Sequence, residues 1–478
     1  MGESSNNEKK SAFAYERENG WKKIAVDEEQ LVENYAKEYI SFLSRAKTER
    51  LAHDIVLNEA IEKGYADLDK LAKGTILKPG DRVFRSCQGR TVFLAMIGSK
   101  PVEEGLHVVG GHIDSPRLDC KQVPLYEDSE LAMFDTHYYG GIKKYQWVAL
   151  PLAIHGVVVK QNGEKIRVSV GDNDDDPVFT ITDLLPHLGK EQAKKTLDEG
   201  IPGEGLNVLI GSRPLNEFEG KGKVKERILR FFNEKYGIIE EDLHSADLEI
   251  VPAGKARELG FDRSMILGYG QDDRICAYAA FRALMDVKST PSYTCVALLC
   301  DKEEIGSTGA TGMESTFFEN SVALLLHAAG TDQVDIARRR CLESSRMISA
   351  DVNSLHDPNY PDVSAPNGNM AALNCGVIIQ KFTGSRGKAG ASEASAEFMA
   401  DIRRLFNSAG VAWQAAELGK VDAGGGGTIA LYMARYGMDV IDVGPGLLSM
   451  HAPWEVSSKL DAYMGWKAYK AFFEDKRG

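Results

Sequence analysis

The sequence predicts an α/β protein in which a β-rich domain is inserted into a domain built on a mostly or partly parallel sheet. The 478 residues exceed what one hydrophobic core usually serves, so two or three domains are expected. From Phe261 onward, short apolar runs alternate with helical patterns, which is typical of a sheet covered on both faces. Between about Val123 and Gly260 the pattern favours strands. We therefore expect the α/β domain at 1–124 and 261–478 and the insert at 125–260.

The first part of the α/β domain begins with two predicted helices. Asp27 to Lys47 carries apolar residues at helical spacing, and Thr48 can start a second helix that runs to Lys63. The pattern then changes to β. Strands are expected at 82–86, 90–97 and 106–110.

The insert is predicted mainly from a hairpin. His155 to Val170 alternates apolar and polar residues around Asn162-Gly163, and both turn residues tolerate positive φ. The acidic run from Asp172 to Asp176 is interpreted as a solvated loop. Helices are expected at 191–199 and 223–235, and a strand at 247–251.

The second part of the α/β domain alternates strands and helices to the end of the chain. Its strands are expected at 293–299, 321–328, 346–350, 376–381 and 439–443. Its helices are expected at 272–287, 313–319, 392–409, 428–436 and 457–473.

Composition excludes several classes of partner. The net charge of −13 argues against general binding to nucleic acid or to an anionic membrane, because both need a basic face. No stretch approaches the roughly 18 apolar residues of a membrane span. The seven cysteines are scattered and never in a CxxC spacing, so neither a disulfide framework nor a zinc knuckle is indicated. We therefore expect a cytoplasmic protein.

Two adjacent carboxylates follow the apolar run at 293–299. Glu303 and Glu304 repel each other, and neither can be buried without a cationic partner. If that partner is a divalent metal, one glutamate can bind it while its neighbour takes a proton from a metal-bound water. For an isolated pair, the alternative is two solvated side chains at a strand end.

Other metal-binding side chains follow further apolar runs. In open α/β sheets such groups gather outside the carboxyl ends of the strands. Imidazole and carboxylate without thiolate suit catalytic Zn, Co or Mn, and two metals are possible if Asp272 bridges them. Asp114 suits a role in orienting His112. Taken singly, each residue has an ordinary interpretation as a helix cap, a loop carboxylate or a packed histidine. The candidate ligands are His112, Asp272, Glu304, Asp351 and His451.

Five motifs in order resemble the aspartyl aminopeptidase family of co-catalytic zinc metallopeptidases over nearly the whole chain. The motifs are 111–118 (GHIDSPRL), 270–274 (GQDDR), 301–307 (DKEEIGS), 348–351 (ISAD) with 356–360 (HDPNY), and 449–451 (SMH). The resemblance implies a phosphorylase/hydrolase-like mixed-sheet catalytic domain with an inserted β-rich dimerisation domain. It also implies dimers that assemble into a dodecamer.

The same resemblance implies individual roles. His112 and Asp351 would hold one metal, Glu304 and His451 the other, and Asp272 would bridge the two ions. Glu303 would be the general base and Asp114 would orient His112. A histidine of the insert can reach a neighbouring subunit's site in this family, and His187 is the position here that resembles it.

Two segments are candidates for binding substrate. The stretch 381–388 resembles only loosely the region in which family members bind an acidic side chain, but Lys381 can contribute to a cationic pocket there. Gly426 and Thr428 lie in a glycine-rich stretch before a predicted helix, where the backbone can approach a peptide closely. The motif 270–274 departs from the family pattern by placing Asp273 beside Asp272; we interpret Asp273 as a helix cap.

The predicted function is a metal-dependent aminopeptidase that releases the N-terminal residue, possibly acidic, from peptides with two divalent ions. A related di-metal amidohydrolase or carboxypeptidase would use the same ligands. A non-enzymatic assembly protein on a peptidase scaffold is the other alternative, although a scaffold has no chemical need of these side chains.

Overall fold

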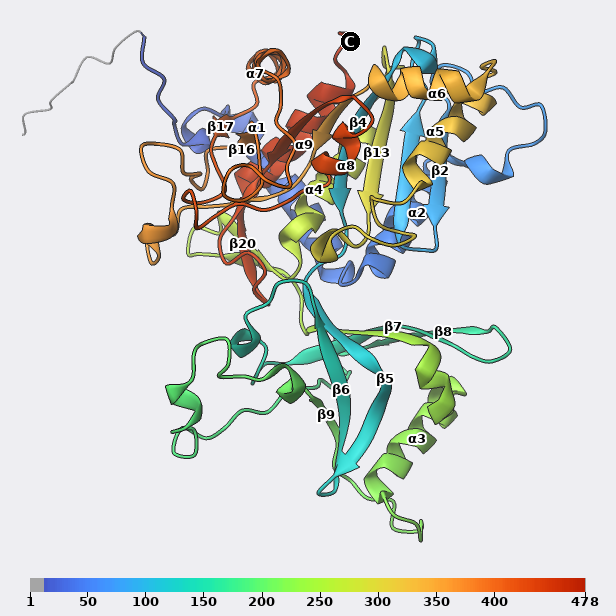
Figure 1. Cartoon of the computed structure of the whole chain (residues 1–478), viewed down its shortest axis with the longest axis vertical. Helices are drawn as coiled ribbons and strands as arrows, with labels where there is room; N and C mark the ends of the chain where they lie inside the picture. Colours follow the sequence, from blue (N-terminus) through green and yellow to red (C-terminus); the bar gives the residue numbers. More distant parts are fainter. Residues whose placement is uncertain (1–12, 478) are drawn as a thin grey trace, which may run out of the picture.

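The computed structural model describes residues 13–477, so residues 1–12 of the first predicted segment and residue 478 lie outside the described part of the chain. Its largest sheet combines strands from both ends of the sequence (Figure 1). In spatial order its strands are β1 (Ala66–Asp67), β2 (Arg82–Cys87), β3 (Thr91–Met96), β13 (Thr294–Cys300), β4 (Leu106–His112), β14 (Arg346–Ser349), β18 (Asp439–Gly444), β16 (Val377–Gln380) and β17 (Trp413–Ala415).

The large sheet is mixed. Strands β13, β4, β14 and β18 are parallel to one another, whereas β3 pairs antiparallel with β13 and β16 pairs antiparallel with β18. Every residue of β4 and β13 is buried, as expected for central strands that are covered on both faces. The predicted mixed-sheet α/β fold class is therefore confirmed.

Helices cover both faces of this sheet. The neighbouring residues Val108 and Val109 of β4 point to opposite faces and belong to different hydrophobic clusters. On the Val109 side lie α1 (Val26–Arg45), α2 (Glu49–Glu62), α4 (Gln271–Met285), α7 (Ala396–Ala409) and α9 (Lys459–Phe473). On the Val108 side lie α5 (Phe317–Ala328), α6 (Val334–Glu343) and α8 (Ala430–Ala434). Within residues 13–477, no helix is both long and apolar enough to cross a membrane.

The second large sheet is antiparallel and lies below the first in Figure 1. The predicted hairpin around Asn162-Gly163 forms two of its strands. Helix α3 (Lys223–Tyr236) packs Phe232 against Phe134 of this sheet. In spatial order its strands are β8 (Lys165–Val170), β7 (Leu152–Val159), β10 (Ala246–Pro252), β5 (Arg117–Asp128), β6 (Leu131–Tyr139) and β9 (Val208–Gly211).

Two small sheets order the loops between the larger elements. Strands β11 (Arg257–Leu259), β12 (Met265–Gly268) and β20 (Glu455–Ser458) form one of them. Strands β15 (Asn353–Ser354) and β19 (Gly446–Leu447) form the other.

Three sequence-based element assignments are wrong. Residues 321–328, predicted as a strand, belong to helix α5, because a short apolar run fits a buried helix face as well as a strand. The helix expected at 313–319 begins only at Phe317. The tract 191–199 contains a short 3₁₀ turn at Gln192–Lys194 rather than an α-helix, and Gln192–Lys194 has no buried side chain to stabilise one.

Candidate metal and catalytic site

The candidate site lies at one edge of the large sheet, where three parallel strands end together. The register places His112 at the end of β4 level with Cys300 at the end of β13. It also pairs Ser349 of β14 with Gly110 of β4, which brings Asp351, two residues later, level with His112. Side chains from distant parts of the sequence therefore gather at one edge, as ligands do in open α/β sheets.

Asp272 enters this site from the start of helix α4. Gly270 precedes it with φ 71°, a left-handed conformation that glycine adopts without steric cost. Each carboxylate oxygen of Asp272 faces a different imidazole: Oδ1 lies 3.2 Å from Nε2 of His112 and Oδ2 lies 3.1 Å from Nε2 of His451. Burial acts to raise the pKa of Asp272, but the two imidazoles hold it below its ordinary value.

The five predicted ligands form two groups that share Asp272. In each group the ligand atoms lie within 4.8 Å of one another. Burial raises the pKa of Glu304 and Asp351 well above the ordinary value, so a nearby cation is needed to keep both side chains charged. One group contains His112, Asp272 and Asp351, and the other contains Asp272, Glu304 and His451.

Asp114 organises one side of the site. Nδ1 of His112 lies 3.2 Å from Oδ1 and 3.1 Å from the carbonyl oxygen of Asp114. Both atoms only accept hydrogen bonds at this contact, so Nδ1 carries the proton and Nε2 has its lone pair free for a metal. The carboxylate also accepts hydrogen bonds from the backbone N–H groups of Glu303 and Glu304, each at 3.2 Å.

Glu303 points at the ligand groups without belonging to either. Its Oε2 lies 3.8 Å from Nε2 of His112. Burial raises the pKa of Glu303 to about 7, and the neighbouring carboxylates of Asp114 and Asp272 add to this shift. A carboxylate with a pKa near neutrality suits a general base.

The other side of the site is held by backbone groups of the antiparallel sheet region. Nδ1 of His451 lies 2.8 Å from the carbonyl oxygen of Gly141, which follows strand β6. The carbonyl can only accept, so Nδ1 of His451 donates and Nε2 is left for a metal. Both histidines therefore have the same protonation pattern, fixed by different partners.

Three residues at the site were not predicted to act there. The buried carboxylate of Glu455 accepts backbone hydrogen bonds from Gln271, Asp272 and His451. Tyr139 donates its hydroxyl proton to Asp114. Asp273 is not the expected helix cap: it is fully buried, and its carboxylate accepts the N–H of His112 at 3.3 Å. The spacing of Glu455 four residues after His451 was the one available sequence signal.

The four predicted substrate-binding residues lie in loops. His187 and Lys381 are exposed. The carbonyl of Gly426 accepts the N–H of Gly384 at 2.5 Å, which joins two loops, and the hydroxyl of Thr428 donates to Asp442 at 2.8 Å. Their roles stay predictions.

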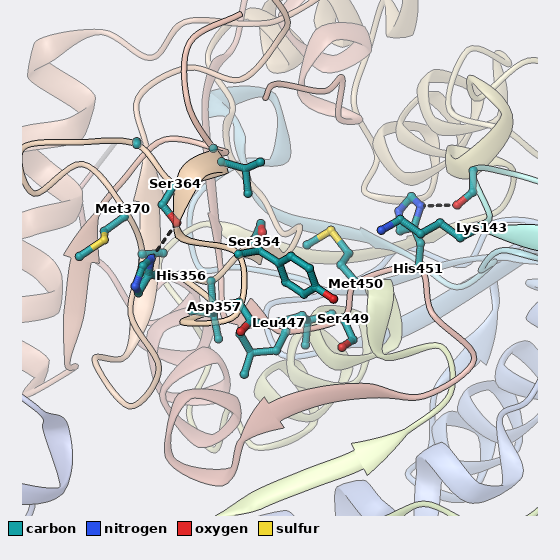
Figure 2. A pocket seen from close by; sticks show the side chains of 18 of the residues that line it. Lys143, Ser354, His356, Asp357, Ser364, Met370, Leu447, Ser449, Met450 and His451 are labelled. Atoms are coloured by element: carbon teal, nitrogen blue, oxygen red, sulfur yellow. Dashed lines mark hydrogen bonds between the residues drawn. The ribbon is translucent and has the colours of Figure 1, made fainter. Parts of the chain in front are cut away.

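A cavity of about 590 Å³ opens beside His451 (Figure 2). His451 lies at one side and His356, hydrogen-bonded to Ser364, at the other, with the side chains of Tyr360 and Met450 among its lining. None of the four predicted substrate-binding residues is among the residues that line it. A cavity of this size next to the ligand groups can hold a few residues of a peptide.

Comparisons with known proteins agree with this site. The family model for aminopeptidase I zinc metalloprotease (M18) matches residues 42–473. A probable M18 family aminopeptidase 1 of Clostridium acetobutylicum is 52% identical over 463 residues, which cover 96% of this chain and 98% of the relative. An M18-family aminopeptidase structure from Thermotoga maritima superposes with a TM-score of 0.91 at 44% identity, covering 96% of this chain and 100% of that chain. A yeast mApe1 dodecamer structure is similar in fold, with a TM-score of 0.74 at 22% identity over 94% of this chain and 98% of that chain.

The predicted family and the predicted enzyme class are thus confirmed. The relatives match along almost their whole length, and the matched region includes all five candidate ligands. The chain belongs to the M18 family of aminopeptidase I zinc metalloproteases, and it is a metal-dependent aminopeptidase.

Proposed function

We propose that the protein releases N-terminal residues from peptides at a site for two divalent ions, with zinc as the preferred metal and cobalt or manganese as possible substitutes. His112 and Asp351 would hold one ion, Glu304 and His451 the other, and Asp272 both. The observation that carries this proposal is the position of Asp272, whose two oxygens face two different imidazoles.

The donor atoms fit this assignment. Two imidazoles and three carboxylates, without thiolate, match the ligands of catalytic zinc sites. Among the described residues, Oε1 of Glu304 is buried without a hydrogen-bond partner. A bound cation would satisfy this atom, which otherwise carries the full cost of burial.

Two bound ions would polarise the first peptide carbonyl and lower the pKa of the attacking water. We assign the proton transfers to Glu303. Its carboxylate takes a proton from the water and delivers it to the leaving amine. Asp114 keeps His112 in the required tautomer and, through two backbone N–H groups, fixes where Glu303 and Glu304 begin.

The substrate is proposed to enter through the cavity beside His451. Lys381 would contribute to recognition of an acidic N-terminal residue, and Gly426 and Thr428 would border the peptide backbone. His187 would act in the site of a neighbouring subunit. The exposed leucines around it support burial of this region in an assembly, since Leu184, Leu185 and Leu188 are more than half exposed in the single chain.

We further propose that residues 125–260 form a dimerisation domain between catalytic parts at 1–124 and 261–478, and that dimers build a dodecamer. The mApe1 dodecamer supports this assembly, because its fold is similar to that of the present chain. A cytoplasmic location is proposed because all seven cysteines are free thiols. The net charge of −13 supports peptides, rather than nucleic acid or membranes, as partners.

Hydrolysis of a panel of X-Ala-Ala peptides with free and acetylated N-termini tests the proposal. We expect cleavage of free peptides only, loss of cleavage after chelation, and recovery with Zn, Co or Mn. Glu303→Gln should lower kcat by about 10²–10⁴-fold with metal retained, because it removes the base. Cleavage of acetylated peptides would favour the related amidohydrolase or carboxypeptidase. Wild-type turnover by Glu303→Gln would remove Glu303 from the role.

A further inference from the structure

We propose that the segment 139–141, where the antiparallel sheet returns to the catalytic site, positions both halves of the metal centre, and that Tyr139 is a positioning residue for the reaction. The inference rests on the metal ligands proposed above. It assigns to the inserted sheet a direct part in activity, separate from any part in assembly.

Strand register brings Tyr139 to the site. Strand β5 leaves the site at Arg117, three residues after Asp114, and β6 returns from the far end of the sheet. The register pairs Arg117 directly with Tyr139. The guanidinium group of Arg117 lies 3.9 Å from the centre of the Tyr139 ring, so the ring is held flat against it. The hydroxyl is thereby directed at Asp114.

The hydroxyl of Tyr139 fixes the carboxylate that links the catalytic groups. It donates to Oδ2 of Asp114 at 2.8 Å, and the same oxygen accepts the N–H of Glu304. The other oxygen, Oδ1, faces His112 and the N–H of Glu303. Since Asp114 is buried, loss of one strong donor would allow its carboxylate to rotate, and every group bonded to it would shift.

The two glycines after Tyr139 bring the same segment to the second ligand group. Gly140 has φ 73°, and a Cβ atom at this position would lie 3.3 Å from Cβ of Glu304. Gly141 presents its carbonyl oxygen to Nδ1 of His451 at 2.8 Å. The absence of side chains therefore lets the backbone contact one ligand and fix the tautomer of another.

Three consecutive residues thus reach both groups of ligands. Tyr139 acts on His112 through Asp114, and Gly141 acts on His451 directly. A displacement of strand β6 would move both contacts together. The position of the inserted sheet is therefore coupled to the geometry of the metal centre.

The test compares Tyr139→Phe with Tyr138→Phe in the full-length protein. Phenylalanine keeps the ring that stacks on Arg117 and removes only the hydroxyl. Tyr138, the neighbouring residue on the opposite face of β6, is 42% exposed and serves as the control. For Tyr139→Phe we expect zinc affinity and kcat each to fall by about 10–100-fold with KM within about twofold, and the visible spectrum of the cobalt-substituted protein to change. Tyr138→Phe should leave all of these unchanged.

A double-mutant cycle with Asp114→Asn separates positioning from a general effect on the fold. If Tyr139 acts through Asp114, Tyr139→Phe should change zinc affinity by less than about threefold in the Asp114→Asn background. Effects that multiply in the double variant would overturn the inference, as would wild-type zinc affinity and kcat in Tyr139→Phe. Failure of the proposed catalytic role is seen separately, because Glu303→Gln would then keep wild-type turnover whatever the zinc affinity of Tyr139→Phe.

Discussion

Glu455 contacts two proposed metal ligands through their backbone rather than their side chains. Its Oε2 accepts the N–H groups of Gln271 and Asp272 at 2.6 and 3.2 Å, and its Oε1 accepts the N–H of His451 at 2.8 Å. One buried carboxylate thus joins the start of helix α4 to the loop that carries His451. Because Asp272 belongs to both ligand groups, the position of Glu455 affects both.

We predict that Glu455→Gln lowers zinc affinity by about 10–100-fold. The amide keeps the size of the side chain but turns one acceptor oxygen into a donor, which then faces a backbone N–H. Competition with a chelator measures the effect, with the exposed Glu343 in Glu343→Gln as the control. Equal zinc affinity in Glu455→Gln and wild type would show that the backbone contacts do not hold the ligands.

The predictability of individual residues depended on the kind of contact they make. The structure brings together the five ligand candidates that the motifs predicted, because each motif follows an apolar strand or starts a helix near the same edge. Tyr139, Asp273 and Glu455 were missed as parts of the site. Their contacts arise from strand register and from the close approach of segments distant in the sequence, which residue type and spacing do not encode.

Among the elements, predictions were reliable where the local pattern matched only one structure. The helix capped by Thr48 and the hairpin at Asn162-Gly163 were correctly predicted, because capping and turn residues define their ends. Helix α5 was mistaken for a strand because the apolar run at 321–328 lacks a distinctive period. Its helical character depends on packing against the sheet, through buried residues such as Val322 and Leu325.

Strand β4 contains a histidine whose protonation should make stability depend on pH. His107 is 1% exposed and stacks between Tyr293 and Phe472, with ring centres 4.7 and 4.9 Å away. Burial lowers the pKa of His107 from 6.5 to about 4. Below pH 6.5 the unfolded chain therefore binds a proton that the folded chain does not, so stability falls as pH falls toward 4.

From pH 7 to pH 5 this histidine should cost about 2 kcal/mol in the free energy of unfolding. His107→Phe keeps an aromatic ring in the stack and removes the titrating group, although it loses the hydrogen bond to the carbonyl of Phe472. We expect the difference in unfolding free energy between wild type and His107→Phe to move by about this amount in favour of the variant at pH 5. Urea unfolding at both pH values measures it. A difference that does not change with pH would contradict the assignment.

At the scale of the whole molecule, the proposed dodecamer makes activity and assembly separable. Leu185 and Leu188 are 56% and 72% exposed in the single chain and flank His187. We predict that Leu185→Asp or Leu188→Asp lowers the mass in solution from twelve copies to smaller species, because a charge would be buried at a subunit contact. His187→Ala should keep twelve copies and lose activity. Sedimentation of the wild type as a single chain would contradict the assembly.

The overall organisation was predictable further than its internal contacts. Length and the change of pattern near Val123 indicated an insert, and the alternation after Phe261 indicated a sheet covered on both faces. The order of strands in the large sheet was not predictable, because β13 lies between β3 and β4 although nearly two hundred residues separate it from them in sequence. This strand order is what brings Glu303 and Glu304 beside His112.

The central claim is that Asp272 lies between two metal ions. Anomalous diffraction from a crystal of the zinc-loaded protein, measured on both sides of the zinc absorption edge, tests it most directly. The account predicts two zinc peaks per chain, one beside His112 and Asp351 and one beside Glu304 and His451, with Asp272 in contact with both. A single peak, or peaks that do not contact Asp272, would contradict it.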